Sequence, residues 1–568
     1  MLLNKKSIEK NINRIFIVSM IAIVAIFLSR IKYGMADVDE TFYLSIPYRI
    51  LQGDCYFIDE WNLAQMYSFM MLPIMKAYLA VFGTTEGIVI AFRVIYIIVQ
   101  MTVTIIGYIL LKKEDKIMAL VSSWIFCLFA PYNIIALSYN TISLMAMYIF
   151  FILSMYKTEH NVIRSLALGI VLAVAVLANP FLIIFWLVYM AVSIFFKIKK
   201  HYNPVFNLKS FMYITIGAGI IAIIFFLFIL TRVSFTHFIS KLYESMPYMK
   251  PDAGHSPVKM FNIVSIIITF LKRFRLYVIP LLSVLVLSLI GIWAKKKRFI
   301  IFSVIAFITG ASTLYSAINH VHNVIMIPLT ILGLVAFIYC KNRNYRIFKY
   351  LYLLPAVHII ILSASSNNGV MAMAMGYIMP SCASLFFIRD FLNEYGMKKI
   401  DMRKALFGLI IIVQIVSQVY AGTQLFFWEN DKATLTTCIG QGPLKGIHTT
   451  SEKAEIYNAD SRNIKKMKNY KGKNVLFFKK FISGYLMLKD TRVGGFSTWI
   501  YDQVWSLYDT KLLGYYEVNP DKVPQIIYVD VETAETYQEI SFAVWCEKNN
   551  YKHKTLKNGG MILRKINN

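Results

Sequence analysis

Acidic side chains gather in one short segment of this chain, and their spacing makes them the first candidates for chemistry. They follow the first strongly apolar run and are Asp37, Asp39, Glu40, Asp54, Asp59 and Glu60. In a chain made largely of apolar residues, carboxylates near a membrane are costly to place, and those that occur are usually functional. A carboxylate in a wet loop is ionised near neutral pH, so it can serve as a general base.

The composition indicates a protein that spans a membrane. Hydrophobic residues make up 58% of the chain and charged residues 16%, against about 45–50% and about 25% in soluble globular proteins. Apolar runs of about 18–24 residues recur, which is the length of helix that crosses the hydrocarbon layer. These runs are too long and continuous for barrel strands. The first run, 15–29, has no small-residue cleavage site after it, and we interpret it as a retained helix.

The fold class predicted from these runs is a polytopic α-helical membrane protein with about thirteen spanning helices. Their predicted ranges are 15–29, 88–111, 117–136, 141–156, 163–178, 181–197, 210–230, 275–294, 299–317, 324–340, 349–366, 371–389 and 405–423.

The distribution of basic residues predicts the orientation. Lysine and arginine gather in short segments between the runs, as the positive-inside rule expects of cytoplasmic loops. With the N-terminus in the cytoplasm, two long loops, 30–87 and 231–274, and the C-terminus lie outside. The net charge of +28 is therefore explained by topology in a plasma or inner membrane, and we predict no nucleic-acid partner.

From about residue 424 the sequence becomes polar, which predicts a transmembrane domain over 1–423 and an extracytoplasmic domain over 424–568. Short apolar runs predict strands, and a helical segment would alternate with them in a small α/β domain. The predicted strands are 475–478, 484–488, 526–529 and 561–563, and the predicted helix is 541–550.

The long loops and the cysteines give further expectations. Segment 62–82 is predicted as helices lying along the membrane interface, and 236–250 is an amphipathic stretch. Six cysteines over this length do not form a disulfide framework. Cys438 and Cys546 would both lie outside, and whether they pair is left open. The sequence has no CxxC or HExxH spacing, so no metal site is predicted from a motif.

The segment Asp39-Glu40-Thr41-Phe42-Tyr43 resembles the first-loop motif of the GT-C glycosyltransferases. The likeness is greatest to the aminoarabinose transferases of lipid A and the protein O-mannosyltransferases. It continues through 49–54, Pro73 and Gly87 to Arg93 in the second helix, and it covers about residues 10–200.

The resemblance implies an inverting transfer of a sugar from a polyprenyl-phosphate carrier to an extracytoplasmic acceptor. The acceptor would be a cell-envelope polysaccharide, a glycolipid or a protein. It also implies that Asp39 is the general base, which agrees with the need for a carboxylate on the face opposite the leaving phosphate. Glu40 would support Asp39, hold a cation, or cap a helix over 41–51.

Other polar residues form the predicted substrate-binding set. An arginine within lipid pairs with an acid or an anion, so Arg93 either pairs with the first loop or binds phosphate. Lys272, Arg273 and Arg275 lie outside against the positive-inside rule, and they either anchor the chain in headgroups or bind a phosphate-bearing lipid. The remaining members stand in the motif or in outer turns and are Tyr43, Asn140, His320, His322 and Asn367.

The need for a metal cofactor is left open. By resemblance, GT-C enzymes that need a divalent cation bring a second acid from the loop after helix three, but 131–140 holds no carboxylate. This favours no cofactor, although Mg²⁺ or Mn²⁺ on one or two carboxylates stays open. Asp54, Asp59 and Glu60 either join an acidic cluster or lie on the loop surface, and the loop surface is the preferred interpretation.

Alternative functions differ in where they place their acids. A transporter or a flippase for lipid-linked saccharides tends to bury acids at mid-membrane in broken helices, whereas the acids here lie in outer loops. A polysaccharide polymerase or ligase would carry basic outer loops in place of an Asp-Glu pair. A receptor would use the polar tail as its binding module. Of these alternatives, the transporter or flippase stands second to the glycosyltransferase.

Overall fold

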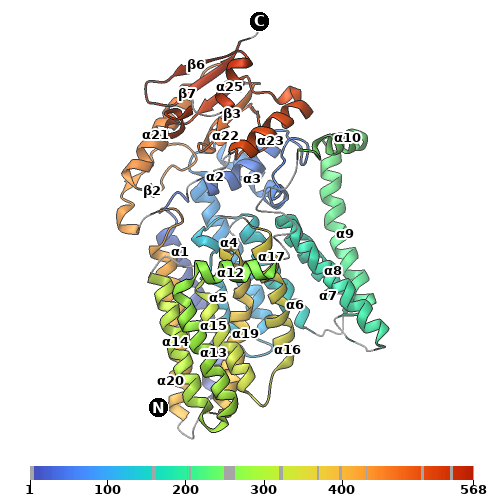
Figure 1. Ribbon diagram of the computed structural model, residues 1–568, viewed down its shortest axis with the longest axis vertical. Helices are drawn as coiled ribbons and strands as arrows, with labels where there is room; N and C mark the ends of the chain where they lie inside the picture. The colour runs from blue at the N-terminus through green and yellow to red at the C-terminus, as the bar shows by residue number, and fades with distance from the viewer. Residues whose placement is uncertain are drawn as a thin grey trace.

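A long bundle of helices stands beneath a smaller α/β domain (Figure 1). The N-terminus lies at the end of the bundle far from this domain, and the C-terminus lies at the domain's outer edge. The computed structural model describes residues 5–36, 38–156, 161–200, 203, 206–248, 262–318, 324–366, 370–395, 400–429, 431–500, 505–537 and 541–566.

Within these residues, nine helices are long and apolar enough to cross a membrane. They are α1 (Lys5–Arg30), α4 (Ile88–Leu111), α8 (Ile183–Ile198), α9 (Leu208–Leu230), α13 (Arg275–Trp293), α14 (Arg298–Ile318), α17 (Leu354–Ala364, with the π-helical turn Phe348–Leu353), α19 (Ile378–Tyr395) and α20 (Ile400–Gln424). Four shorter apolar helices accompany them: α5 (Lys116–Cys127), α6 (Tyr139–Met155), α7 (Asn161–Ala178) and α15 (Met326–Tyr339). Together they correspond to the predicted segments, and the predicted fold class of a polytopic helical membrane protein is confirmed.

The outward faces of the bundle are apolar, as contact with lipid requires. Ile21 on α1, Ile223 on α9 and Phe307 on α14 are all exposed in the isolated chain. Between helices the packing is close, and α7 and α9 approach each other through glycines. A Cβ atom at Gly169 would lie 2.1 Å from the carbonyl oxygen of Ile214, so only glycine fits this helix contact.

One predicted helix ends earlier than expected. The apolar run 117–136 predicts a continuous span, but α5 stops at Cys127 and the chain turns through the 3₁₀ segment Pro131–Asn133. Proline cannot donate to a helix, and Tyr132 and Asn133 both adopt positive φ. The apolar residues that follow are nevertheless buried, because they pack beneath the outer layer described next.

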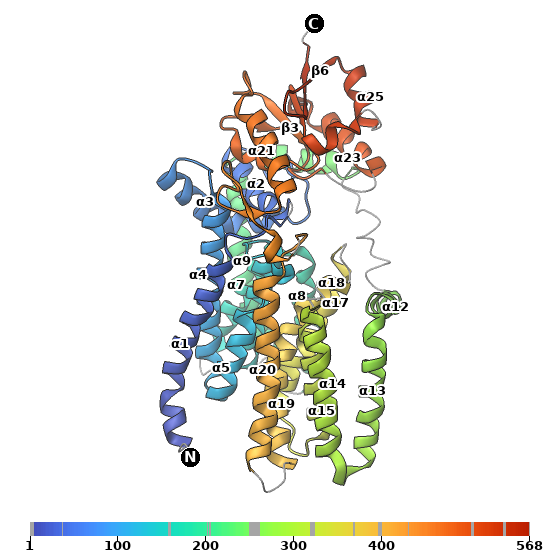
Figure 2. The same cartoon turned by 90° about the vertical axis from the view of Figure 1, so that its left-hand side faces the viewer.

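That layer is formed by the two long loops. The first contributes α2 (Asp39–Leu51) and α3 (Ser68–Phe82), and the second contributes α10 (Phe235–Ser245) and α12 (Ile263–Arg273). All four lie toward the α/β domain, whereas the turn between α13 and α14 lies at the opposite end (Figure 2). That turn carries Lys295–Lys297. Helix α3 lies within the predicted segment 62–82, α10 covers the first part of the amphipathic stretch, and the described parts of both long loops lie on the side of the C-terminal domain.

The C-terminal domain is built on a five-stranded sheet in the order β4-β3-β5-β7-β6. β3 pairs in parallel with β4 and β5, while β5 with β7 and β7 with β6 pair antiparallel. The elements are β1 (Thr437–Cys438), β2 (His448–Thr449), α21 (Ser451–Lys465), β3 (Asn474–Phe478), α22 (Ser483–Met487), β4 (Arg492–Val493), α23 (Trp505–Val518), β5 (Ile526–Val529), α24 (Val531–Ala534), α25 (Ser541–Lys548), β6 (Tyr551–Thr555) and β7 (Met561–Lys565). Every residue of β3 and β5 is buried, which marks them as the centre of the domain.

The sequence predicted three of these strands correctly and one wrongly. The run 484–488 lies mostly in helix α22, where Gly484 packs closely against the ring of Phe477. The strand β6 was missed because its sequence, Tyr-Lys-His-Lys-Thr, is polar and lies at the sheet edge. Cys438 is exposed, Cys546 is buried, and both are free thiols.

Candidate functional site

Helix α2 carries the two acids of the motif in its first turn. Asp39 and Glu40 begin the helix, where negative charge is favourable beside the unpaired N–H groups. Every residue from Glu40 to Ile50 is buried, so the helix is enclosed between the bundle and the α/β domain. The helix predicted over 41–51 is present, and neighbouring positions on it point in different directions because successive residues turn by about 100°.

Glu40 faces inward and forms a buried ion pair with Arg93 of α4. Arg93 Nε donates to Glu40 Oε1 at 2.8 Å, and Nη2 donates to the second carboxylate oxygen. The remaining N–H groups of Arg93 donate to the carbonyl oxygens of Ile31, Tyr33 and Gly34. Arg93 therefore has no N–H group left for a phosphate. Of the two roles considered for it, the geometry supports the pairing with the first loop.

Asp39 stands on the other side of the helix and remains half-exposed. Tyr43, one turn further along α2, donates its hydroxyl to Asp39 Oδ1 at 3.0 Å. Burial and the neighbouring carboxylate raise the pKa of Tyr43 well above its usual value, so this hydroxyl keeps its proton. Asp39 is thus a half-buried carboxylate oriented by Tyr43, whereas both oxygens of Glu40 are engaged by Arg93.

Aromatic rings enclose the Asp39 side of the helix. The ring of Tyr43 packs edge-on against Tyr67 at 6.4 Å and against Tyr139 at 5.7 Å. Tyr67 also donates its hydroxyl to the carbonyl oxygen of Tyr43 at 2.9 Å. Asn140 follows Tyr139 in the first turn of α6 and is half-buried. The structure therefore brings Tyr43 and Asn140 to the neighbourhood of Asp39, as the sequence predicted for binding residues.

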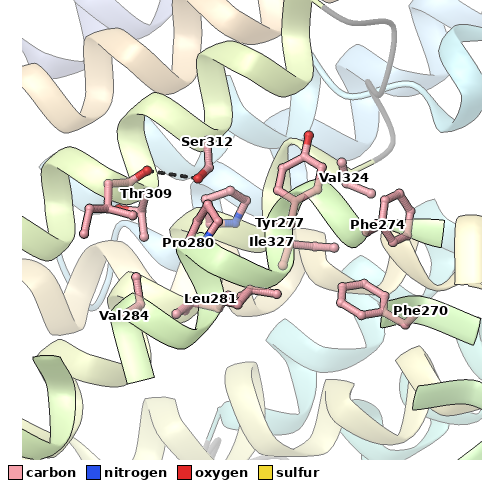
Figure 3. Close-up of a pocket in the computed structure, with 13 residues that line it drawn as sticks. Phe270, Phe274, Tyr277, Pro280, Leu281, Val284, Thr309, Ser312, Val324 and Ile327 are labelled. Atoms are coloured by element: carbon pink, nitrogen blue, oxygen red, sulfur yellow. Dashed lines mark hydrogen bonds between the residues drawn. The ribbon is translucent and has the colours of Figure 1, made fainter. Parts of the chain in front are cut away.

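The basic cluster stands apart from Asp39. Lys272 and Arg273 end α12, Arg275 begins α13, and all three are exposed. Figure 2 shows α12 at the opposite side of the bundle from α1. Beneath the cluster, α12, α13, α14 and α15 line a small, partly open apolar pocket with a cavity volume of about 30 Å³. Phe270, Phe274 and Tyr277 line it at the end next to the cluster (Figure 3). His320, His322 and Asn367 lie outside the described residues.

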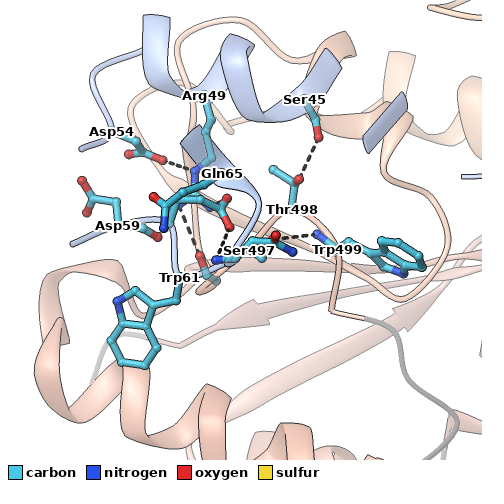
Figure 4. Close-up of polar contacts among 12 residues, drawn as sticks. Ser45, Arg49, Asp54, Asp59, Trp61, Gln65, Ser497, Thr498 and Trp499 are labelled. Carbon is cyan, nitrogen blue, oxygen red and sulfur yellow. Dashed lines mark hydrogen bonds and ion pairs between the residues drawn. The ribbon is translucent and has the colours of Figure 1, made fainter. Parts of the chain in front are cut away.

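The acids after α2 form a buried ionic network, which corrects the expectation that they lie on the loop surface. Arg49 Nε contacts Asp54 at 2.5 Å, and Arg49 Nη1 contacts Glu60 at 2.8 Å. Lys522 of the C-terminal domain contacts Asp54 at 2.6 Å and Asp59 at 3.0 Å. Figure 4 shows Arg49 reaching toward Asp54 from α2. The C-terminal domain covers these residues, so that all are buried except Asp59, which is half-buried. No sequence pattern pointed to Lys522 as the partner.

The carboxyl groups of this network outnumber its cations, and their pKa values shift in different directions. Arg49 and Lys522 hold the pKa of Asp54 below its ordinary value. Burial raises the pKa of Glu60, and burial together with Asp54 raises that of Asp59. Three carboxyl groups therefore share two cations in a site with little water. The network fixes the position of α2 relative to the C-terminal domain.

A glycine-rich segment of the C-terminal domain, 494–499, completes the cover over α2. Thr498 Oγ1 accepts a hydrogen bond from Ser45 at 2.7 Å, and the ring of Trp499 packs against Phe42 at 5.2 Å. Figure 4 shows Thr498 and Trp499 beneath the helix that carries Ser45. Neither Thr498 nor Trp499 was among the predicted site residues. Two adjacent glycines before an aromatic residue were the only signal, and glycines allow close approach of backbone.

The described residues contain no group of three or more His, Cys, Asp or Glu side chains arranged to hold a metal ion. Both carboxylate oxygens of Glu40 are engaged by Arg93. Asp39 is therefore the member of the motif that could offer oxygen to the divalent cation left open by the sequence.

Comparisons with known proteins find likenesses in structure alone. No family model matches the chain, and no curated protein matches it in sequence. Among solved structures, an oligosaccharyltransferase of Archaeoglobus fulgidus tethered with an acceptor peptide matches at 12% identity and a TM-score of 0.45, over 99% of this chain and 75% of that one. The oligosaccharyltransferase AglB of the same organism, in complex with an inhibitory peptide and a dolichol-phosphate, matches at 12% identity and 0.44, over 97% and 74%.

A third structure is ArnT from Cupriavidus metallidurans bound to undecaprenyl phosphate, with 10% identity, a TM-score of 0.47, and 97% of both chains covered. These enzymes are GT-C glycosyltransferases, the type that the sequence resembles. Likenesses this distant do not assign an activity to the chain, so its function has to be argued from its own side chains.

Proposed function

We propose that this chain is a membrane glycosyltransferase of the GT-C type. It transfers a sugar from a polyprenyl-phosphate carrier to an acceptor outside the cytoplasm, with inversion at the anomeric carbon. The observation that carries the proposal is the difference between the two acids of the motif. Glu40 forms a buried ion pair with Arg93, whereas Asp39 is half-exposed and accepts a hydrogen bond from Tyr43. A reachable, oriented carboxylate is what a general base must be.

In the proposed reaction, Asp39 accepts the proton of the acceptor's nucleophilic group. The acceptor oxygen or nitrogen attacks the anomeric carbon from the face opposite the phosphate. The bond between that carbon and the phosphate oxygen breaks, and polyprenyl phosphate leaves with the electron pair. The proton on Asp39 then passes to solvent. Because phosphate is already a good leaving group, the site needs one base and no strong general acid.

In the proposed reaction, the donor lipid is first captured at α12 and the start of α13. The basic cluster Lys272, Arg273 and Arg275 attracts the anionic headgroup of the lipid at the membrane surface. The aromatic and aliphatic side chains below it form an apolar surface suited to contact with isoprenoid units. The cluster and Asp39 stand on different sides of the bundle, so this surface receives the lipid and does not position its reacting end.

The burial of acids argues against the transporter or flippase. Among the described residues, the fully buried acids are Glu40, Asp54, Glu60, Asp460 and Asp530. All of them lie in α2, in the loop after it, or in the C-terminal domain, and none lies in a spanning helix. Transporters bury such groups at mid-membrane. The buried acidic side chains of this chain are concentrated at one end of the bundle, where a transferase would bind its acceptor.

The test compares Asp39→Asn with the wild type in transfer from polyprenyl-phosphate-linked hexose, aminosugar and pentose donors. The matched control is Asp490→Asn, which removes an exposed carboxylate of the C-terminal domain. Loss of a general base lowers the rate by about 10²–10⁴-fold, and the control should keep wild-type activity. Full activity of Asp39→Asn would remove Asp39 from the mechanism, and absence of transfer by the wild type with every donor would reject the function.

A further inference from the structure

Basic side chains gather in two segments of the C-terminal domain that the proposed mechanism does not use. The segment 462–473 runs from the last turn of α21 to the start of β3 and contains no acid. The chain from residue 548 to its end contains none either. The basic residues of the two segments are Arg462, Lys465, Lys466, Lys468, Lys471 and Lys473, and Lys548, Lys552, Lys554, Lys557, Arg564 and Lys565.

The fold brings these two segments together. Nη2 of Arg564, on β7, donates to the carbonyl oxygen of Lys468 at 2.7 Å. Nδ2 of Asn463 donates to the carbonyl oxygen of Gly559 at 2.8 Å. Lys552 of β6 lies directly opposite Arg564 in the sheet, so the two side chains point to the same face. Exposed lysines of both segments therefore lie on adjoining parts of the domain. We call this set the basic surface, and it comprises Lys466, Lys468, Lys471, Lys552 and Lys554.

All five lysines of the basic surface are exposed, and within the described residues none of them forms an ion pair. The neighbouring Lys465 does have a partner, since it contacts Glu86 of the loop between α3 and α4 at 3.2 Å. Lys552 and Lys554 are separated by one residue of β6, so they point to the same face about 7 Å apart. The basic surface thus presents separate, hydrated cations to the solvent.

Local rules account for only part of the basic surface. Lysines on an edge strand hinder its pairing with another chain, which explains those of β6. Cations in the last turn of a helix are favoured by its dipole, which explains the bases at the end of α21. Neither rule covers Lys468 and Lys471 in the loop that follows. The positive-inside rule does not cover them either, because the basic turn 295–297 lies at the opposite end of the bundle.

The position and the composition of the basic surface indicate what it binds. Figure 1 shows β6 and the C-terminus at the end of the domain away from the helix bundle, so a bilayer around the bundle does not reach this edge. The exposed residues of 466–473 and 551–555 are lysine, histidine, asparagine, threonine and glycine. A stable interface with a protein would instead centre on apolar or aromatic side chains and be poor in lysine. Separate lysines suit a ligand whose negative charges repeat along its length, because each charge can meet a cation of its own.

We infer that the basic surface binds a linear anionic glycopolymer, one that carries phosphodiester or carboxylate groups along its chain. The binding depends on charge complementarity between exposed groups, so salt weakens it. The further step, that this polymer is the acceptor of the sugar, rests on the proposed function. In that case the basic surface holds one part of the polymer while another part receives the sugar.

The experiment measures the binding of fluorescently labelled polymers to the full chain in nanodiscs of zwitterionic lipid, at low and at high salt. The probes are poly(glycerol phosphate), polygalacturonate, polyglutamate and uncharged dextran, and vesicles of phosphatidylglycerol test the bilayer. One variant joins Lys468→Gln with Lys471→Gln, a second joins Lys552→Gln with Lys554→Gln, and a third combines all four changes. The control joins Lys295→Gln with Lys296→Gln, which removes exposed lysines at the opposite end of the bundle.

We expect the wild type to bind poly(glycerol phosphate), polygalacturonate or both at low salt and to release them at high salt. Which of the two polymers binds distinguishes phosphodiester from carboxylate groups. Each lysine at an anionic surface is worth about a few-fold in affinity, so the variant without all four lysines should bind about tenfold more weakly or less. Each double variant should fall in between, and it keeps the test open where the fourfold variant folds poorly. The control should bind as the wild type.

Equal binding by the wild type and the variants of the basic surface would overturn the inference. So would equal binding of dextran, binding of polyglutamate alone, or lysine-dependent binding of vesicles in place of polymers. The role as acceptor has its own measurement: the fourfold variant should raise KM for the anionic polymer and leave kcat unchanged, and equal KM values would reject that role. The proposed function fails separately, since lysine-dependent binding by a chain that transfers no sugar would support the basic surface while rejecting the glycosyltransferase.

Discussion

The ionic network between α2 and the C-terminal domain predicts a large effect from one substitution, Lys522→Met. Lys522 is buried and contacts Asp54 at 2.6 Å and Asp59 at 3.0 Å. Methionine fills a similar volume without charge, so the change removes the cation and little packing. Three carboxyl groups would then share the single guanidinium of Arg49. Breaking a buried ion pair on one side costs about 3–5 kcal/mol.

The cost should depend on pH, and its sign follows from the carboxyl groups. The pKa of Asp59 is already raised by burial and by Asp54, and losing Lys522 removes the cation that lowers it. A carboxyl whose folded pKa lies above its unfolded pKa loses stability as pH rises through the folded value. The variant should therefore lose most stability at neutral and alkaline pH, and it should recover part of it in acid, where Asp59 is protonated.

The assay is the thermal midpoint of the detergent-solubilised chain between pH 5 and pH 8, followed by the near-UV signal of the aromatic residues. For the C-terminal domain, a loss of this size corresponds to a drop on the order of 10 °C at neutral pH. Lys557→Met is the control, because Lys557 is exposed in the same domain. A drop that is equal at every pH, or no drop at all, would refute the reasoning that Lys522 neutralises Asp54 and Asp59.

Two further predictions concern single hydrogen-bonded groups. Tyr43→Phe removes the hydroxyl that donates to Asp39; we expect transfer to fall by about tenfold and the acidic limb of the pH–rate profile to move to higher pH, because the carboxylate loses a bond that favours its charged form. An unchanged profile would show that Tyr43 does not orient the base. Burial raises the pKa of Asp460 to about 7, so its contribution to stability is present below about pH 4 and is lost as pH rises through 7. Asp460→Asn keeps the oxygen that accepts a hydrogen bond from Tyr528. It should stabilise the folded chain at pH 8 by up to ~4 kcal/mol and so raise its thermal midpoint there, with little change near pH 4. Equal midpoints of the variant and the wild type at pH 8 would contradict the raised pKa of Asp460.

Sequence patterns fixed those parts of the fold that depend on local physics. A spanning helix must satisfy its backbone within itself and present apolar side chains to lipid, so its hydrophobic run identifies it without any partner. The same holds for α2, whose acids occupy its first turn, and for the buried strands β3 and β5. The motif also directed attention to Asp39, whose half-exposed position the structure shows. Its catalytic role stays a prediction.

Only the tertiary structure decided which charges are paired. Asp54 and Glu60 lie in a polar loop and were predicted at the surface, but both are buried, and Asp54 pairs with Lys522, more than four hundred residues later. Arg30 ends an ordinary spanning helix, and its burial depends on Asn133 and Phe426 from two distant segments. The backbone at Tyr33 likewise pairs with His448 of the C-terminal domain. Hydrophobic periodicity can be recognised from residues that are close in the sequence. The neutralisation of a charge depends instead on which distant side chains the fold brings within a few ångströms of it.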